Sequence, residues 1–135
     1  MNYWLMKSEP FKYSYAQLQK DKKTGWDGVR NHLAARNLKT MKKGDIGFFY
    51  HSNEGVEIVG TIEIVREAYP DPSDETGKFV MVDVKPLKAA KTPLTLAAIK
   101  ADPKLKDMQM IKQSRLSVSE VTAAEAKHIL KLIGC

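Results

Sequence analysis

Apolar residues recur along the chain with two different periods, and each period predicts a different element. Short apolar runs and strict alternation are typical of β-strands. We place these strands at residues 3–7, 46–51, 56–68 and 79–87, with a further strand favoured at 115–118. Gly60 interrupts the long alternating run, and a glycine in mid-strand predicts a bend or a close backbone approach.

Apolar residues at helical spacing predict four short helices. Two of them open with capping boxes, at Ser14 with Gln17 and at Thr122 with Glu125. The other two are predicted over residues 31–41 and 95–101. The last helix is expected to bury Ala126, Ile129, Leu130 and Ile133.

Strands and helices do not alternate regularly, which argues against a doubly wound parallel sheet. Long antiparallel strands with a glycine bend favour a small curled sheet or barrel. We therefore expect an α+β fold, in which about five to six mostly antiparallel strands form a curled sheet flanked by short helices. The chain has 135 residues, and we expect a single domain over residues 1–135.

Residues 25–31, Gly-Trp-Asp-Gly-Val-Arg-Asn, fit neither period. The two glycines allow backbone angles closed to other residues and leave space beside the flat indole of Trp26. Arg30 offers a planar donor fork, and Asn31 an amide that donates and accepts. The segment can therefore present a flat ligand with polar edges, such as a nucleobase. The alternative is structural, with the Asn31 side chain stabilising a turn through nearby backbone.

The chain is basic, with 22 Lys and Arg residues against 16 Asp and Glu and a net charge of +6. A basic surface favours a polyanion such as DNA or RNA, although many small soluble proteins are basic without such a partner. Its single cysteine, Cys135, cannot form an internal disulfide, which is typical of a reducing compartment. With no leader peptide or membrane span in the sequence, we expect a cytoplasmic protein without membrane contact.

Sequence signatures of catalysis and metal binding are missing. The three histidines, His32, His51 and His128, have no metal-type spacing with one another or with cysteine. Neither a nucleophile elbow nor a phosphate-binding glycine loop is present. We therefore expect no metal and no cofactor, and a binding protein rather than an enzyme.

Several segments, which together span nearly the whole chain, follow one another in a known order. They are Tyr3–Pro10, Trp26–Asn31, Gly44–Asp45 with Phe48–Asn53, Ala68–Asp71 and Arg115–Val118. Together they resemble the EVE domain family of the PUA-like superfamily. The resemblance implies a PUA-like curled barrel and kinship with YTH readers of methylated adenine and with ASCH domains. It also implies recognition of a modified base, of the methylcytosine or hydroxymethylcytosine type, flipped into a pocket.

The resemblance further implies that four segments surround one cavity. The site residues it assigns are Lys7, Ser8, Glu9, Pro10, Trp26, Gly28, Val29, Arg30, Asn31, Phe49, His51, Ser52, Arg115, Leu116 and Ser117. Trp26 would stack on the base. The base edge would meet Ser8, Asn31, His51 and Ser52. Phosphate or sugar would meet Lys7, Arg30 and Arg115.

One segment departs from the family pattern. Many members continue after the Arg-Asn pair with Tyr-Gln-Ala-Arg-Asn, whereas this chain has His-Leu-Ala-Ala-Arg-Asn over residues 32–37. A shift of one position on a helix turns a side chain by roughly 100°. Contacts made by the second pair in the family therefore do not transfer directly to Arg36 and Asn37.

The sequence supports one leading hypothesis and two alternatives. The leading hypothesis is a monomeric, non-catalytic protein that reads a modified nucleobase in DNA or RNA. The first alternative is a PUA-like module that binds tRNA or rRNA. The second is a sensor of a small nucleotide or an enzyme that acts on one.

Overall fold

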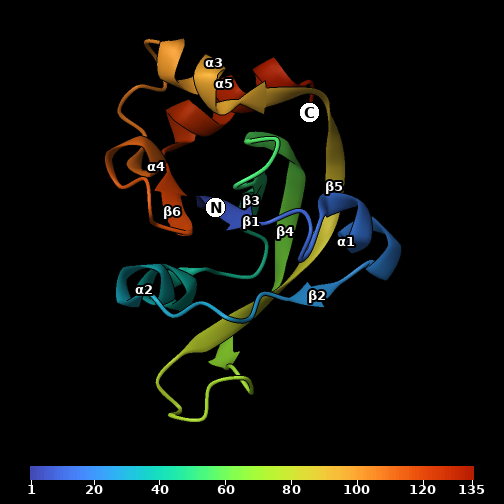
Figure 1. The fold of residues 1–135 in the computed structure, drawn as a ribbon, viewed down its shortest axis with the longest axis vertical. Helices are drawn as coiled ribbons and strands as arrows, with labels where there is room; N and C mark the ends of the chain where they lie inside the picture. The colour runs from blue at the N-terminus through green and yellow to red at the C-terminus, as the bar shows by residue number, and fades with distance from the viewer.

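A computed structural model describes all of residues 1–135 and contains one six-stranded sheet and five helices (Figure 1). The strands are β1 Tyr3–Ser8, β2 Thr24–Gly25, β3 Ile46–His51, β4 Glu57–Pro70, β5 Val80–Thr95 and β6 Val118–Val121. The helices are α1 Tyr15–Asp21, α2 His32–Thr40, α3 Leu96–Ala101, α4 Gln109–Lys112 and α5 Ala123–Ile133. The expected α+β fold, a mostly antiparallel sheet with short flanking helices, is confirmed.

The sheet has the strand order β2-β5-β4-β3-β1-β6, and its one parallel pair is β1 with β3. Parallel strands end at the same edge of a sheet. The last residues of this pair, Ser8 and His51, therefore lie opposite each other. Beyond them, the Ser52 N–H donates to the Ser8 carbonyl at 2.9 Å. This edge brings together two of the segments assigned to the site.

The alternation of side chains along β1 and β3 divides the core into two clusters. Met6 and Phe49 belong to one cluster, while Leu5 and Phe48 belong to the other. This is the result of strand geometry, in which successive side chains point to opposite faces of the sheet. Trp4 belongs to the first cluster and is buried. In Figure 1, α3 and α5 lie together beside the end of β5 at the top of the view.

The strand is irregular at Gly60, in line with the predicted bend, and the group that approaches it closely is a side chain rather than backbone. A Cβ atom at Gly60 would lie 2.4 Å from Cζ of the Tyr15 ring, so only glycine fits beneath that ring. The Tyr15 hydroxyl donates to the Thr61 carbonyl at 2.8 Å. The pairing of β4 with β5 shifts register on both sides of Gly60, which curls the sheet at this position.

The predicted caps hold, with one difference. Thr122 forms a complete capping box with Glu125. The Ser14 hydroxyl accepts from the Gln17 N–H, but the Gln17 side chain donates to Asp21 at 2.9 Å and does not reach back to Ser14. Of the residues expected to be buried on the last helix, three are buried and Leu130 is half-buried. None of the five helices has the length and apolar character needed to cross a membrane.

The strand predicted at residues 115–118 is wrong in position. The strand there is β6, which begins at Val118, and α4 precedes it. The N–H of Leu116 donates to the Gln113 carbonyl at 3.0 Å, so this part of the chain forms a turn. Leu116 is buried nonetheless, which explains the apolar alternation that suggested a strand.

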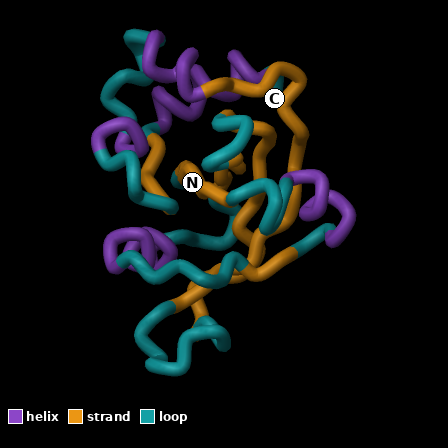
Figure 2. Tube along the Cα trace, viewed as in Figure 1, coloured by secondary structure: helices purple, strands orange, loops and turns teal.

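Both long strands extend further than the pattern predicts. Tyr69 and Pro70, expected in a loop, pair with Met81 and Val80 of β5. Pro70 is the last residue of its strand, a position where its missing N–H costs little. At its other end β5 continues to Thr95, and the unpredicted β2 pairs with it. Figure 2 shows the loop between β4 and β5 protruding beyond the sheet.

Candidate functional site

A cavity of about 290 Å³ opens where β1 ends, beside the indole of Trp26. We call it the Trp26 cavity. Its lining residues are Lys7, Ser8, Lys12, Tyr13, Thr24, Gly25, Trp26 and Asp27. The Ser8 hydroxyl donates to the Tyr13 carbonyl at 2.6 Å, which closes the turn between β1 and α1 against the strand end. Three of the assigned site residues therefore share this cavity, and the turn supplies two more walls.

Trp26 forms the apolar wall of the cavity and is only 8% exposed. Its backbone N–H donates to the Val82 carbonyl at 2.7 Å, and its ring meets Phe49 nearly perpendicularly, with centroids 5.3 Å apart. Its indole N–H makes no hydrogen bond within the protein, while Ser119 Oγ is the only polar side-chain atom that is both sealed from solvent and unpartnered. The Trp26 N–H therefore stays accessible as a donor to a ligand.

Phe49 lies behind Trp26, fully buried, and contacts the rings of Tyr15 and His51 as well. His51 Nε2 accepts the backbone N–H of Tyr15 at 3.2 Å. Burial lowers the pKa of His51, with the Glu57 carboxylate opposing this effect. The ring is therefore held in its neutral form with Nε2 as the acceptor. Phe49 therefore packs behind Trp26, and His51 packs on Phe49 and bonds to the start of α1.

Asp71, on the loop after β4, anchors the segment that carries Trp26. One carboxylate oxygen accepts from the Gly28 N–H at 2.8 Å and from Arg30 at 3.2 Å. The other accepts from the backbone and hydroxyl of Ser73 at 2.8 and 2.6 Å. Burial raises the pKa of Asp71, but these hydrogen bonds outweigh burial and lower it to about 2. The anchor is therefore charged over the whole physiological pH range.

The polar groups of Arg30 and Asn31 are largely occupied by local structure. The Arg30 guanidinium contacts Asp71 and Ser73 and lies 5.4 Å from the centre of the Phe79 ring. The Asn31 carboxamide oxygen accepts the Ala34 N–H at 3.0 Å and caps α2. The structural interpretation of Asn31 therefore holds for its oxygen. Its amide nitrogen makes no hydrogen bond within the protein, and Asn31 lines a second cavity, described below.

Two more cavities are present, of which one shares Lys7 with the Trp26 cavity and the other shares Ser114 with that second cavity. The Arg115 cavity, about 350 Å³, is lined by Asn31, Leu33, Lys112, Gln113, Ser114, Arg115 and Leu116. The Tyr50 cavity, about 420 Å³, is lined by Lys7, Tyr50, Ser52, Asn53, Val56, Leu96, Lys100, Met110, Ile111 and Ser114. Ser52 and Arg115, assigned to the site from the sequence, each line one of them.

Lys7 stands at the junction of the three cavities. It lines the Trp26 and Tyr50 cavities. Its ammonium donates at 2.8 Å to the carbonyl of Ser114, a residue that lines both the Tyr50 and the Arg115 cavities. The same ammonium lies 5.8 Å from the centre of the Tyr50 ring. Burial lowers the pKa of Lys7. A cation held by one carbonyl and one aromatic face, with no carboxylate partner, is available to an anionic ligand.

The three cavities are electropositive. Asp27 is the only acidic side chain among their lining residues. The cationic lining residues are Lys7, Lys12, Lys100, Lys112 and Arg115. Clefts lined by one sign of charge concentrate ligands of the opposite sign.

Eight of the assigned residues line none of these three cavities: Glu9, Pro10, Gly28, Val29, Arg30, Phe49, His51 and Ser117. Glu9 pairs with Lys12 at 3.2 Å and accepts from Asn53. Val29 is buried in the core, and the Ser117 carbonyl accepts the Lys7 N–H at 2.9 Å. Pro10 and Gly28 contribute backbone geometry, to the turn after β1 and to the contact with Asp71.

On α2, Arg36 is exposed whereas Asn37 is buried and donates to the Val118 carbonyl at 2.8 Å. Asn37 therefore joins α2 to β6 and is not presented to a ligand.

Sequence reasoning missed several residues around the site. Lys12 and Tyr13 belong to the polar exit of β1, the kind of segment where site residues often lie, so the Pro10 turn was a usable signal. Asp71 lies within a segment of the family resemblance, but its role as anchor depends on Gly28, 43 positions away. No local pattern indicates such a contact.

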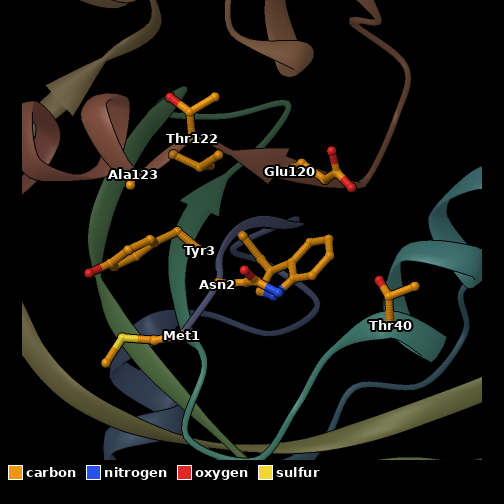
Figure 3. Close-up of a pocket in the computed structure, with 9 residues that line it drawn as sticks. Met1, Asn2, Tyr3, Thr40, Glu120, Thr122 and Ala123 are labelled. Atoms are coloured by element: carbon orange, nitrogen blue, oxygen red, sulfur yellow. The ribbon is translucent and has the colours of Figure 1, made fainter.

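A fourth cavity, of about 340 Å³, lies at the start of β1 (Figure 3). Figure 3 shows Tyr3, Thr40, Glu120 and Thr122 arranged around it, from β1, α2, β6 and the start of α5. None of the assigned site residues contributes to this cavity. Its only charged side chain is Glu120, so it is less suited than the other three to a polyanion.

A curled, mostly antiparallel sheet with short flanking helices and ligand-sized cavities at its strand ends is a PUA-like module. Residues 2–132 match the EVE domain. The chain belongs to the EVE domain family.

Curated relatives and solved structures agree with this assignment. Thymocyte nuclear protein 1 of Rattus norvegicus is 39% identical over 165 residues, covering 97% of this chain and 73% of that protein. The NMR structure of a Rhodopseudomonas palustris protein has a TM-score of 0.94 and 54% identity, with 99% and 94% of the two chains covered.

The crystal structure of human THYN1 protein in complex with 5-methylcytosine-containing DNA has a TM-score of 0.90 and 36% identity, covering 100% of this chain and 99% of that one. An ASCH protein from Zymomonas mobilis matches with a TM-score of 0.62 at 8% identity, which shows a likeness of fold alone.

Proposed function

We propose that this protein is a non-catalytic reader of a modified nucleobase, of the methylcytosine or hydroxymethylcytosine type, which it accepts flipped into the Trp26 cavity. The observation that carries the proposal is this cavity, with Trp26 as its apolar wall and Lys7 and Lys12 among its lining residues. Its volume of about 290 Å³ is near the lower end of small-molecule sites, as a single base requires. The human THYN1 complex with 5-methylcytosine-containing DNA supports the choice of ligand.

The energetics of flipping fit the site. Extruding a base from a duplex costs a few kcal/mol, and stacking on an aromatic side chain returns roughly 1–3 kcal/mol. Hydrogen bonds to the base edge and contacts between phosphate and the cationic rim supply the rest. Under this proposal Trp26 and Ser8, which line the cavity, contact the base, and Lys7 faces phosphate or sugar. Asn31, Ser52 and Arg115 line the two neighbouring cavities and would meet the flanking nucleotides. His51 and Arg30 line none of these cavities, and the Arg30 guanidinium is engaged by Asp71 and Ser73, so both support the site from outside it.

The test measures binding by fluorescence anisotropy at fixed salt. The probes are one oligonucleotide with 5-methylcytosine, its unmodified copy, and a structured RNA. We expect the modified DNA to bind several-fold more tightly than its copy, because a buried methyl group contributes roughly 0.8 kcal/mol. Equal affinity for the two DNAs would refute the proposal that the protein recognises the modified base. Tightest binding to the RNA would favour the RNA-binding alternative.

Trp26→Ala is expected to weaken binding of the modified DNA by about 1–3 kcal/mol. Because Trp26 is also part of the core, circular dichroism must show that the variant is folded. Lys12→Gln provides an independent variant, since its side chain is 70% exposed and its loss leaves the core intact. We expect Lys12→Gln to weaken the binding of modified and unmodified DNA equally. Lys20→Gln, on α1 and outside the three cavities, is expected to leave the binding of both unchanged.

Non-catalytic action, a monomeric state and a cytoplasmic location belong to the same proposal. Mass spectrometry of the modified oligonucleotide after incubation with the protein is expected to show no change in mass. Light scattering during size-exclusion chromatography is expected to give the mass of one chain, 15.2 kDa. A changed oligonucleotide mass would favour an enzyme, and a dimer mass would require a second copy in the binding scheme.

A further inference from the structure

Phe11 is the aromatic side chain that the fold leaves without a partner. It is 69% exposed, while Phe48 and Phe49 are fully buried and the two tryptophans nearly so. A large apolar side chain alone on the surface is a common observation. The surroundings of Phe11, however, give it a definite place relative to the site.

The turn that carries Phe11 is held rigidly. The N–H groups of Lys12 and Tyr13 both donate to the Glu9 carbonyl, at 3.0 and 2.9 Å. The Ser8 hydroxyl donates to the Tyr13 carbonyl, and the Glu9 carboxylate pairs with Lys12 at 3.2 Å. With both ends of the turn fixed, the Phe11 ring projects from a defined position.

Phe11 does not itself line the Trp26 cavity, but the turn that carries it does. Ser8 lines the cavity before the turn, and Lys12 and Tyr13 line it after the turn. The Lys12 ammonium lies 6.0 Å from the centre of the Phe11 ring, so an exposed apolar ring lies beside a cation that lines the cavity. This combination suits a duplex, which offers phosphates to the cation and a base stack to the ring.

We propose that Phe11 is the wedge that enters a DNA duplex at the place the flipped base leaves. This inference rests on the proposed function. When a base leaves the stack, the neighbouring bases and the orphaned partner base expose apolar faces to water. An apolar side chain inserted at that step covers these faces and stabilises the open state. A single-stranded ligand has no such gap, so the wedge acts on duplex DNA alone.

The experiment compares a 5-methylcytosine duplex with the single strand of the same sequence, by anisotropy at one salt concentration. Phe11→Ala is expected to weaken duplex binding about tenfold or more, the loss of roughly one stacked aromatic contact, and single-strand binding less than about twofold. Phe11→Trp is expected to retain duplex binding. Leu132→Ala on α5, which removes another exposed apolar side chain, serves as the control.

Several results would overturn the proposal that Phe11 inserts into the duplex. Equal losses on duplex and single strand would make Phe11 a stacking contact for unpaired bases. Unchanged affinity for both would leave the ring free for another partner, such as a protein. The proposed function fails separately, when the wild-type protein shows no preference for the modified base in either form of DNA. Because Phe11 is exposed, thermal unfolding of the variants is expected to match the wild type.

Discussion

The carboxylate of Asp71 allows the sharpest test of how the site is held together. Asp71→Asn keeps the shape of the side chain but removes its charge and replaces one acceptor oxygen with a donor. That donor would face either the Gly28 N–H and Arg30 or the two donors of Ser73. In either orientation at least one buried donor loses its acceptor.

The magnitude can be worked out from the pKa. The pKa of Asp71 is about 2 in the folded protein, against an ordinary value of 3.8. Each pKa unit corresponds to about 1.36 kcal/mol, so the charged carboxylate contributes about 2 kcal/mol to folding. Hydrogen bonds to charged groups, at about 1.5–3 kcal/mol each when lost, give a similar figure. We expect Asp71→Asn to lower the free energy of unfolding by about 2 kcal/mol at pH 7.

The pH dependence has a definite sign. The folded pKa of Asp71 lies below its unfolded value, so its contribution is complete well above pH 3.8 and disappears as the pH falls towards about 2. The difference in stability between wild type and Asp71→Asn should therefore shrink over this window. The pKa of Asp74 is also lowered to about 2, by its hydrogen bonds with Thr76 and Phe79. Asp74 titrates in the wild type and in Asp71→Asn alike, so its contribution cancels in the stability difference between them.

Urea unfolding at pH 7, 4 and 2.5 measures this difference, with Glu75→Gln in the same loop as an exposed control. Two results would refute the reasoning. Equal stability of Asp71→Asn and the wild type at pH 7 would mean that the anchor contributes nothing. A difference that stays constant down to pH 2.5 would mean that the charge of Asp71 is not the cause.

Three further predictions concern the sheet, the helix junction and the rim. Gly60→Ala is expected to lower stability in urea by about 1–3 kcal/mol, because the added methyl collides with the Tyr15 ring; an unchanged midpoint would contradict the close approach. Asn37→Ala should cost about 1–3 kcal/mol in the same assay, because it leaves the buried Val118 carbonyl unpaired. Arg115→Gln should reduce the slope of log affinity against log salt by about 0.7–0.9, and an unchanged slope would remove Arg115 from the phosphate contacts.

Local chemistry was enough to predict much of the fold. The capping box at Thr122, the apolar run of β3 and the bend at Gly60 all follow from patterns within a few residues. The error at residues 115–118 has a local cause as well, because Leu116 is buried from a turn and leaves the same apolar alternation as a strand. Burial periodicity reports which side chains face the core, and not which backbone groups pair.

Contacts between distant segments could not be predicted in this way. Asp71 meets Gly28 across 43 positions, and Asn37 meets Val118 across 81. Each contact depends on where the sheet places two loops, and no residue near either partner encodes it. The family resemblance supplied the site segments. It did not show that the Arg30 guanidinium is engaged by Asp71 or that the Asn31 oxygen caps α2.

The single parallel pair explains why segments so far apart meet. Antiparallel pairing of β1 with β3 would place their last residues at opposite edges of the sheet. Parallel pairing sets Ser8 opposite His51, and β6, pairing with β1 on its other side, brings Ser117 against Lys7. This pairing places the cationic residues Lys7 and Lys12, the buried ring of Phe49 and the turn at Pro10 close to one another. Trp26 is fixed from one side by its N–H hydrogen bond to the Val82 carbonyl, and Asp71 fixes the residues that follow it through Gly28 and Arg30. Loss of the Asp71 carboxylate should therefore lower stability and ligand affinity together.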